Sequence, residues 1–228
     1  PIYTPPPTQP LLEHCSSSTA NWFIILFMST TETTKFKAVD LAYIAVFAAL
    51  IIVLGGVQFP VGVSGVPIVL QNMGILLASL ILGFWRGGLA TTLFIAVGFV
   101  GVPNMAGWKP AAAAVAGPTV GYIVGYVIAA FVIGLIAQYA PRNLNARAAV
   151  FFLAGIVGVI IQYLCGTVGL MVRLDYSLGT ALATNTPFIP GDLIKIVLAV
   201  AIALAVTKAV PDLLPTLRKP QNADSLKA

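Results

Sequence analysis

Charged residues are scarce in this sequence of 228 residues. Asp, Glu, Lys and Arg make up only 8% of the chain, 59% of it is hydrophobic, and its mean hydropathy is +0.98. A soluble globular domain carries about 25% charged residues, so that class is excluded. The composition predicts an all-α membrane protein, and the length allows about six spans of roughly 20 residues without a sizeable soluble domain. Any ATPase that drives this protein must therefore be another chain.

Residues that commonly carry chemistry are scarce too. The one histidine is His14, and the two cysteines, Cys15 and Cys165, lie in a polar leader and in an apolar run. This inventory excludes an HExxH motif and a histidine-based triad, and no segment matches a phosphate-binding loop. We expect no disulfide, no metal site and no cofactor. An intramembrane enzyme remains an alternative only through a carboxylate pair of Asp175 and Asp192.

Basic residues outnumber acidic ones by 12 to 7, but they form no patch, so nucleic-acid binding is not expected. They lie instead at the ends of apolar runs, as expected for a protein oriented in a lipid bilayer. The apolar runs predict six transmembrane helices, at residues 38–54, 68–84, 89–102, 118–139, 148–172 and 192–210.

The distribution of these basic residues predicts the orientation. With six spans, nine of them fall on one side of the membrane and only Lys109 and Arg173 on the other, so both termini are predicted to be cytoplasmic. Three irregular segments then meet at the outer face, at Gly55–Pro67, Gly101–Lys109 and Pro187–Lys195. The nine are Lys35, Lys37, Arg86, Arg142, Arg147, Lys208, Arg218, Lys219 and Lys227.

The two ends of the chain differ from the predicted membrane domain at 28–215. Residues 1–27 hold a proline run and a serine cluster, and their apolar run, Trp22–Phe27, is too short to cross a bilayer. We interpret them as a disordered extension that reflects a mis-called start, with Met28 as the natural first residue. Residues 216–228 are predicted to be a cytoplasmic tail.

Two ionisable residues stand at the start of the last apolar run. Asp192 is a favourable N-cap residue, and Lys195 follows it at a spacing that places both on one helical face. A lysine in the first helical turn opposes the helix dipole, so a carboxylate or an anionic ligand should compensate it. The alternative is that Asp192 only caps the helix while Lys195 extends to the lipid headgroups.

Two further patterns each permit two interpretations. Small residues recur at helical spacing in the first predicted helix, which suits either packing within the protein or docking of another subunit. The amides of Gln71 and Asn72 at the start of the second helix suit either interhelical hydrogen bonds or a ligand. The small residues are Ala38, Ala42, Ala45 and Ala49.

Three motifs occur in a fixed order along the chain. Gly101–Gly107 reads Gly-x-Pro-x-x-Ala-Gly, Gly117–Tyr122 reads Gly-Pro-Thr-x-Gly-Tyr, and Pro187–Lys195 reads Pro-Phe-x-Pro-Gly-Asp-x-x-Lys. With these motifs and spacings the chain resembles, from about Lys35 to Val210, the BioY family of biotin-specific substrate-binding (S) components of energy-coupling factor (ECF) transporters. It departs from the family pattern after Gly107, where further glycines are frequent.

The resemblance implies a non-enzymatic protein with the six-helix S-component fold in a bacterial cell membrane. It implies capture of biotin at the outer face and import driven by a transmembrane coupling subunit (T component) and two ATPase subunits. The alanine stripe resembles the face by which S components dock on the membrane partner. A stand-alone secondary transporter is the alternative, although the predicted spans hold no carboxylate deep in the bilayer.

The resemblance also implies a set of binding residues. Asp192 and Lys195 match family positions that line the biotin pocket, and we expect Lys195 to receive the carboxylate and Asp192 the ureido N–H groups. Trp108 and the tyrosines suit an aromatic wall, although the same residues are common as interfacial anchors. The other candidates are Gln71, Asn104, Gly107, Trp108, Tyr122 and Tyr163.

Overall fold

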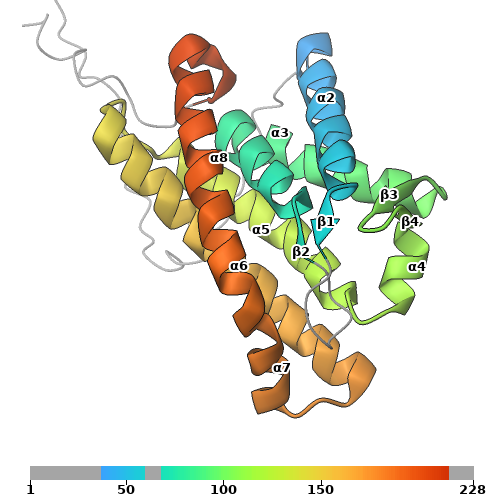
Figure 1. Ribbon diagram of the computed structural model, residues 1–228. Coiled ribbons are helices and arrows are strands. Elements are labelled where there is room, and N and C mark those ends of the chain that lie inside the picture. The colour runs from blue at the N-terminus through green and yellow to red at the C-terminus, as the bar shows by residue number, and fades with distance from the viewer. Residues whose placement is uncertain (1–36, 60–67, 216–228) are drawn as a thin grey trace, which may run out of the picture. The chain divides into compact units, whose positions relative to one another are not determined.

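A computed structural model describes residues 37–59 and 68–215, and the membrane domain from Ala38 onward is a bundle of helices (Figure 1). Five helical segments in it are long and apolar enough to cross a membrane, which confirms the predicted all-α membrane class. They are α2 (Ala38–Gly55), α3 (Gln71–Phe99), α5 (Val120–Gln138), α6 (Leu144–Leu174), and α7 (Leu178–Asn185) joined by a short 3₁₀ turn to α8 (Ile189–Ala209).

The second and third predicted helices both lie in α3, which bends sharply at Gly83. This residue has a φ of +77°, which glycine adopts without a steric penalty. A Cβ placed on Gly87 would lie 2.7 Å from the Cα of Ser79, although eight residues of straight helix span about 12 Å. The chain therefore turns back on itself, and the bend lies three residues before the predicted turn at Arg86.

Contacts at this bend place it beside the start of α2 and the residues that follow α8. Arg86 forms a 2.8 Å ion pair with Asp40 at the start of α2, and it donates a 3.2 Å hydrogen bond to the carbonyl of Leu213 beyond α8. We call this side of the bundle the bend end.

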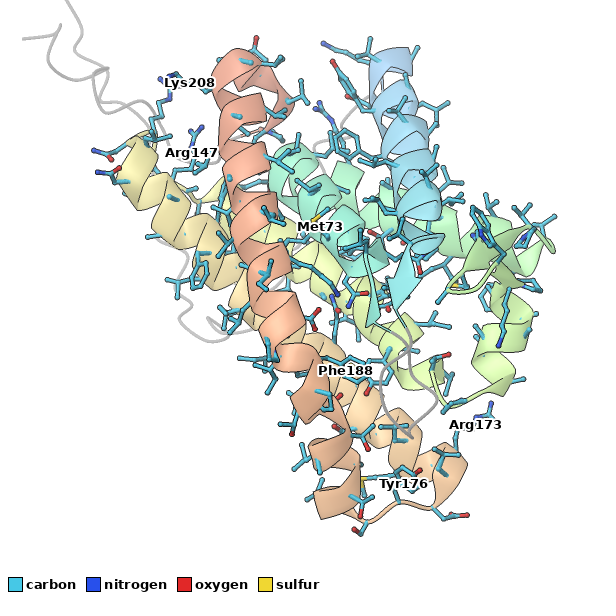
Figure 2. The ribbon with its side chains drawn as sticks, viewed as in Figure 1. Met73, Arg147, Arg173, Tyr176, Phe188 and Lys208 are labelled. Atoms are coloured by element: carbon cyan, nitrogen blue, oxygen red, sulfur yellow. The ribbon has the colours of Figure 1, made fainter. Side chains whose placement is uncertain are left out.

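Figure 2 shows Arg147 and Lys208 at one end of α6 and α8 and Arg173 at the other. This separation matches the predicted alternation of basic residues.

The opposite end, which we call the hairpin end, carries the short elements. Strands β1 (Gln58–Phe59) and β2 (Ile68–Val69) pair antiparallel, and so do β3 (Pro103–Met105) and β4 (Lys109–Pro110). Helix α4 (Ala111–Ala116) follows β4. Residues 60–67 of the predicted outer loop lie outside the described residues.

Glycines allow α5 and α6 to pack closely. A Cβ on Gly121 would lie 2.9 Å from the Cα of Gly169, and a Cβ on Gly125 would lie 3.0 Å from the Cα of Gln162. Small residues of this kind let helix backbones approach where larger side chains would separate them. This contact sets the positions from which the α6 side chains face α8.

The start of the last helix differs from the prediction. Helix α8 begins at Ile189, and Pro190 lies in its first turn, where a missing N–H costs nothing and the fixed φ favours the helix. Pro190 and Gly191 therefore belong to the helix instead of the loop before it. The preceding helix α7 was not predicted.

Candidate functional site

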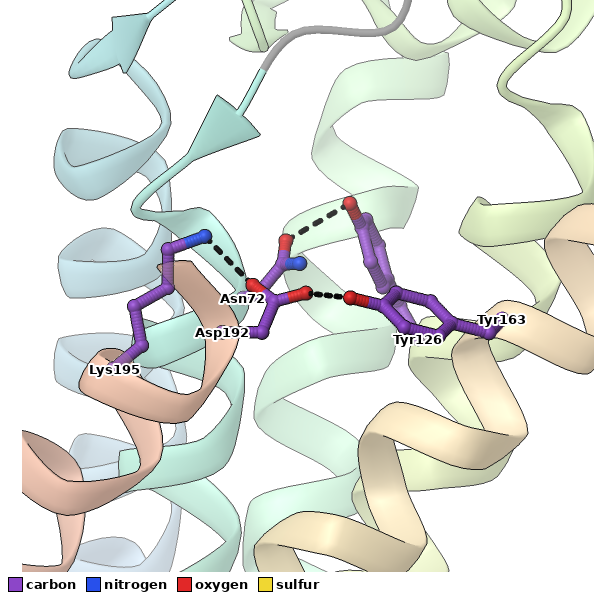
Figure 3. Close-up of polar contacts among 5 residues, drawn as sticks. All are labelled: Asn72, Tyr126, Tyr163, Asp192 and Lys195. Carbon is purple, nitrogen blue, oxygen red and sulfur yellow. Dashed lines mark hydrogen bonds and ion pairs between the residues drawn. The ribbon is translucent and has the colours of Figure 1, made fainter. Parts of the chain in front are cut away.

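Asp192 and Lys195 form a buried ion pair in the first turns of α8. The Nζ of Lys195 lies 2.8 Å from the Oδ1 of Asp192, and the two residues are only 6% and 4% exposed. The hydroxyl of Tyr163 on α6 donates a 2.6 Å hydrogen bond to the other carboxylate oxygen, Oδ2 (Figure 3). One carboxylate thus links a lysine of its own helix to a tyrosine of a neighbouring helix.

This geometry overturns the capping interpretation of Asp192. The residue lies inside the first turn, the N-cap position belongs to Phe188, and no side chain caps the helix there. Lys195 does not extend to lipid headgroups, because its ammonium group is buried against Asp192. The lysine is compensated as the dipole argument requires, by the carboxylate three residues before it.

A second polar pair faces the first across the bundle. Tyr126 on α5 donates a 3.0 Å hydrogen bond from its hydroxyl to the Oδ1 of Asn72 in the first turn of α3 (Figure 3). Asn72, Asp192 and Lys195 line one pocket between α3, α5, α6 and α8. Its other lining residues are Met73, Leu76, Ile133, Gly155, Val159, Gln162 and Ile196.

The pocket combines a few polar groups with a mainly apolar wall, which is the usual composition of a small-molecule site. It is narrow and has room for about one water molecule, so a larger ligand requires its walls to separate. The ion pair has no net charge, yet it presents an N–H donor directly beside carboxylate acceptors. Such a pair is suited to hold a neutral group that carries an acceptor next to a donor.

Gln71 and Asn104 lie in a separate structural contact at the hairpin end. Gln71 is fully buried and donates a 2.8 Å hydrogen bond from Nε2 to the backbone carbonyl of Asn104. The side-chain amide of Asn104 donates to the carbonyl of Phe94. These two predicted binding residues join α3 to β3, whereas the neighbouring Asn72 faces the pocket.

Tyr122 belongs to another buried network. Its hydroxyl donates a 2.6 Å hydrogen bond to the Oδ1 of Asn185 in α7, and the Nδ2 of Asn185 donates a 3.0 Å bond to the hydroxyl of Thr167. This network attaches α7 to α5 and α6. Tyr122 is thus placed to hold the segment that leads into α8.

Gly107 and Trp108 lie in the turn between β3 and β4. Both have positive φ, 73° and 55°, and the Trp108 side chain is 57% exposed while its ring approaches Gly56. The structure therefore places Trp108 over the end of α2 and not among the lining residues of the pocket. Of the predicted binding residues, it brings together Asp192, Lys195 and Tyr163.

Two polar residues that line the pocket, Asn72 and Gln162, were not among the predicted binding residues, and neither was Tyr126, which is hydrogen-bonded to Asn72. Asn72 was recognised only as an amide beside Gln71, and the first turn of α3 directs the two side chains to different neighbours. Tyr126 lies one helical turn after Tyr122, which was a usable signal. Gln162 precedes Tyr163 and carried no sequence signal beyond being an amide in an apolar run.

The alanine stripe of α2 is exposed along its whole length. Ala38, Ala42, Ala45 and Ala49 all lie on the surface, whereas the face that packs on the bundle is formed by other residues. Packing within the protein therefore does not explain this stripe. The buried residues of the helix are Ile44, Ala48, Ile51 and Gly55.

Comparisons with known proteins give a consistent result. The sequence model described as BioY family matches residues 28–212, so residues 1–27 lie outside the match. The chain is 39% identical to a protein of Rhodobacter capsulatus named biotin transporter BioY, over 77% of this chain and 96% of the relative. It is 33% identical to a protein of the same name from Rhizobium etli, with the same coverage of both chains.

A solved structure shows the same fold. It is the crystal structure at 2.1 Å of the S-component for biotin from an ECF-type ABC transporter. The two chains are 33% identical with a TM-score of 0.69, and the similarity covers 78% of this chain and 95% of that one. The S-component fold expected from the sequence is thereby confirmed.

Proposed function

The chain belongs to the BioY family, and on that premise we propose that it binds biotin as the S component of an ECF-type ABC transporter in the cell membrane. The family consists of transporter subunits, so the intramembrane enzyme is set aside. The observation that carries the proposal is the buried ion pair of Asp192 and Lys195 in a pocket between four helices. Ionisable residues within a membrane domain are costly to bury, so a pair of this kind points to a functional site.

The ion pair suits the ureido ring of biotin. A ureido group has one carbonyl acceptor between two N–H donors, and the pair offers an ammonium donor beside carboxylate acceptors. We propose that Lys195 donates to the ureido carbonyl while Asp192 accepts one N–H. This differs from the expectation that Lys195 receives the biotin carboxylate, because the charge of Lys195 is already matched within the protein.

The energetics support a neutral group at this position. Burying a second carboxylate beside Asp192 would leave two negative charges around one ammonium group, and an uncompensated buried charge costs several kcal/mol, on the order of 3–5. A ureido group adds no charge and lets the donor and acceptors stay paired. The biotin carboxylate then lies away from the pair.

We propose the exposed stripe of α2 as the face that docks on the T component. Its four alanines leave a shallow surface on which another helix approaches closely. The bend end is proposed to face the cytoplasm because it carries Arg86, Arg147 and Lys208. Biotin then enters at the hairpin end and two ATPase subunits act from the opposite side.

Two measurements test this function. Titration of the purified protein in detergent with biotin tests binding, and absence of heat at saturating biotin would refute the proposal. Purification of the tagged protein from its native membrane tests assembly, with a T component and two ATPase subunits expected to accompany it. Biotin uptake by cells that lack these partners would support the stand-alone transporter instead.

A further inference from the structure

We infer that Gln162 is a third contact to the ureido group, and that its side-chain oxygen accepts the N–H that Asp192 does not reach. This inference rests on the proposed function and extends it to a residue that determines specificity. Gln162 lies in the middle of α6, is only 4% exposed, and lines the same pocket as the ion pair.

The evidence for a ligand contact is an amide without a partner. A buried polar group is normally hydrogen-bonded, and leaving it unpaired costs about 1–3 kcal/mol. Among the described residues, Gln71, Asn104 and Asn185 each donate to an oxygen of the protein. The amide of Gln162 has no hydrogen bond in that part of the chain, although the residue is only 4% exposed. Its amide atoms keep some accessible surface, since the side-chain atom that is fully buried without a partner among the described residues is the Oδ1 of Asn104.

The pocket provides a side-chain acceptor for the second N–H that accepts no other hydrogen bond among the described residues. Four of its lining residues have polar side chains, and two of these, Asp192 and Lys195, bind the other edge of the ureido group in our proposal. The Oδ1 of Asn72 already accepts from Tyr126. That oxygen can accept a second bond, but the amide oxygen of Gln162 on α6 is not shared with any donor of the described residues, and we assign the second N–H to it.

The pattern of contacts defines the class of ligand. A cyclic urea needs one donor for its carbonyl and two acceptors for its N–H groups, and Lys195, Asp192 and Gln162 supply this set. A cyclic carbamate, which has an oxygen in place of one N–H, lacks one of the two donors. The site should therefore distinguish a urea from the nearly isosteric carbamate, because a pocket group is left unpaired with the wrong ligand.

Gln138 offers a matched control in the same molecule. It is 7% exposed and also has no hydrogen bond within the described residues, but it lies at the bend end beside Gly83 and outside the pocket. Replacing it removes an amide of similar burial without touching the proposed ligand contacts. The variants Gln162→Met and Gln138→Met keep the side-chain length, and Gln162→Leu checks that the result does not depend on one replacement.

The experiment is calorimetric titration of these variants with biotin and with the two cyclic carbamate analogues in which one ureido N–H is replaced by oxygen. Titration reports the affinity of the folded fraction, so a lower yield of a variant does not obscure the result. We expect Gln162→Met and Gln162→Leu to bind biotin roughly 5- to 150-fold more weakly. One of the two carbamates lacks the N–H that meets Gln162. Its affinity for the two Gln162 variants should be about the same as its affinity for the wild-type protein. Gln138→Met should bind biotin normally.

Two results would overturn the inference. Wild-type affinity for biotin in both Gln162 variants would show that the amide contacts no ligand. An equal loss for biotin and for both carbamates would show a general structural role. Failure of the wild-type protein to bind biotin would instead refute the proposed function, so the two failures are distinguishable.

Discussion

The hydroxyl of Tyr163 lies 2.6 Å from the Oδ2 of Asp192, so a side chain of α6 fixes the carboxylate that Lys195 holds from within α8. We expect Tyr163→Phe to lower the free energy of unfolding by about 1.5–3 kcal/mol, the usual range for a hydrogen bond to a charged group. Denaturation in detergent without biotin measures this. An unchanged unfolding transition would mean that the ion pair alone positions Asp192.

Lys195→Ala should weaken biotin and biotinamide by the same factor. The loss of a buried charged donor costs about 2–5 kcal/mol, which is roughly a 30-fold to several-thousand-fold fall in affinity. Since we place the ureido group at Lys195, removing the carboxylate from the ligand should not change that factor. A clearly smaller loss of affinity for biotinamide than for biotin in the titrations would show that Lys195 binds the biotin carboxylate.

Changes at Asp192 should separate stability from binding. Asp192→Asn leaves the buried ammonium of Lys195 without its counter-charge, so we expect a loss of stability of about 3–5 kcal/mol. The double variant Asp192→Leu/Lys195→Met should recover most of that stability, because apolar groups can replace a buried ion pair. It should nevertheless fail to bind biotin. Tight binding of biotin by the double variant would show that Asp192 and Lys195 do not contact the ligand.

Ala45→Phe should abolish transport while biotin binding is preserved, because a bulky side chain prevents close approach of a helix to the exposed stripe of α2. Leu50→Phe is the control, since Leu50 is exposed on the same helix but lies away from the stripe. Uptake of labelled biotin in cells and titration of the purified variants give the two readouts. Normal transport in Ala45→Phe would place the docking face elsewhere.

Gly83→Ala should destabilise the protein by more than 1 kcal/mol, since an L side chain at a φ of +77° is strained by about 1–2 kcal/mol and the new Cβ would also press on Gln138. Gly101→Ala controls for backbone strain alone, because Gly101 has a φ of +104° but no atom near its Cβ position. Thermal unfolding of both variants measures the difference. Equal losses would mean that crowding at Gly83 contributes nothing.

Periodicity and composition predicted most of the helices because long apolar runs leave few alternatives. They placed the reversal of α3 at Arg86 because a basic residue followed by two glycines is typical of a turn. The chain instead bends at Gly83, where a Cβ on Gly134 of α5 would lie 2.6 Å from the backbone of Gly83 and a Cβ on Gly83 would meet the side chain of Gln138. That requirement comes from the packing of helices distant in sequence, so a local pattern does not reveal it.

The candidate site, like the helices, was predicted only in part from the sequence. The spacing of Asp192 and Lys195 correctly placed them together, because three residues within one helix determine a common face. Gln71 and Asn72 looked equivalent in the sequence, and only the rotation of α3 against α5 and α8 assigns one to the protein interior and the other to the pocket. Gln162 stands out only after the partners of the other buried amides are known.

The contact between Arg86 and Leu213 has a consequence for the order in which the protein is assembled. The two residues are 127 positions apart, and a chain is synthesised from its N-terminus, so Asp40 is available to the guanidinium group long before Leu213. The long intervening loop also makes this contact costly to form early. A biosynthetic intermediate that ends within α8 would thus already hold α2 against α3 and still leave the guanidinium group open to water. Protection of Arg86 from a guanidine-specific reagent would mark the moment at which the last helix is in place.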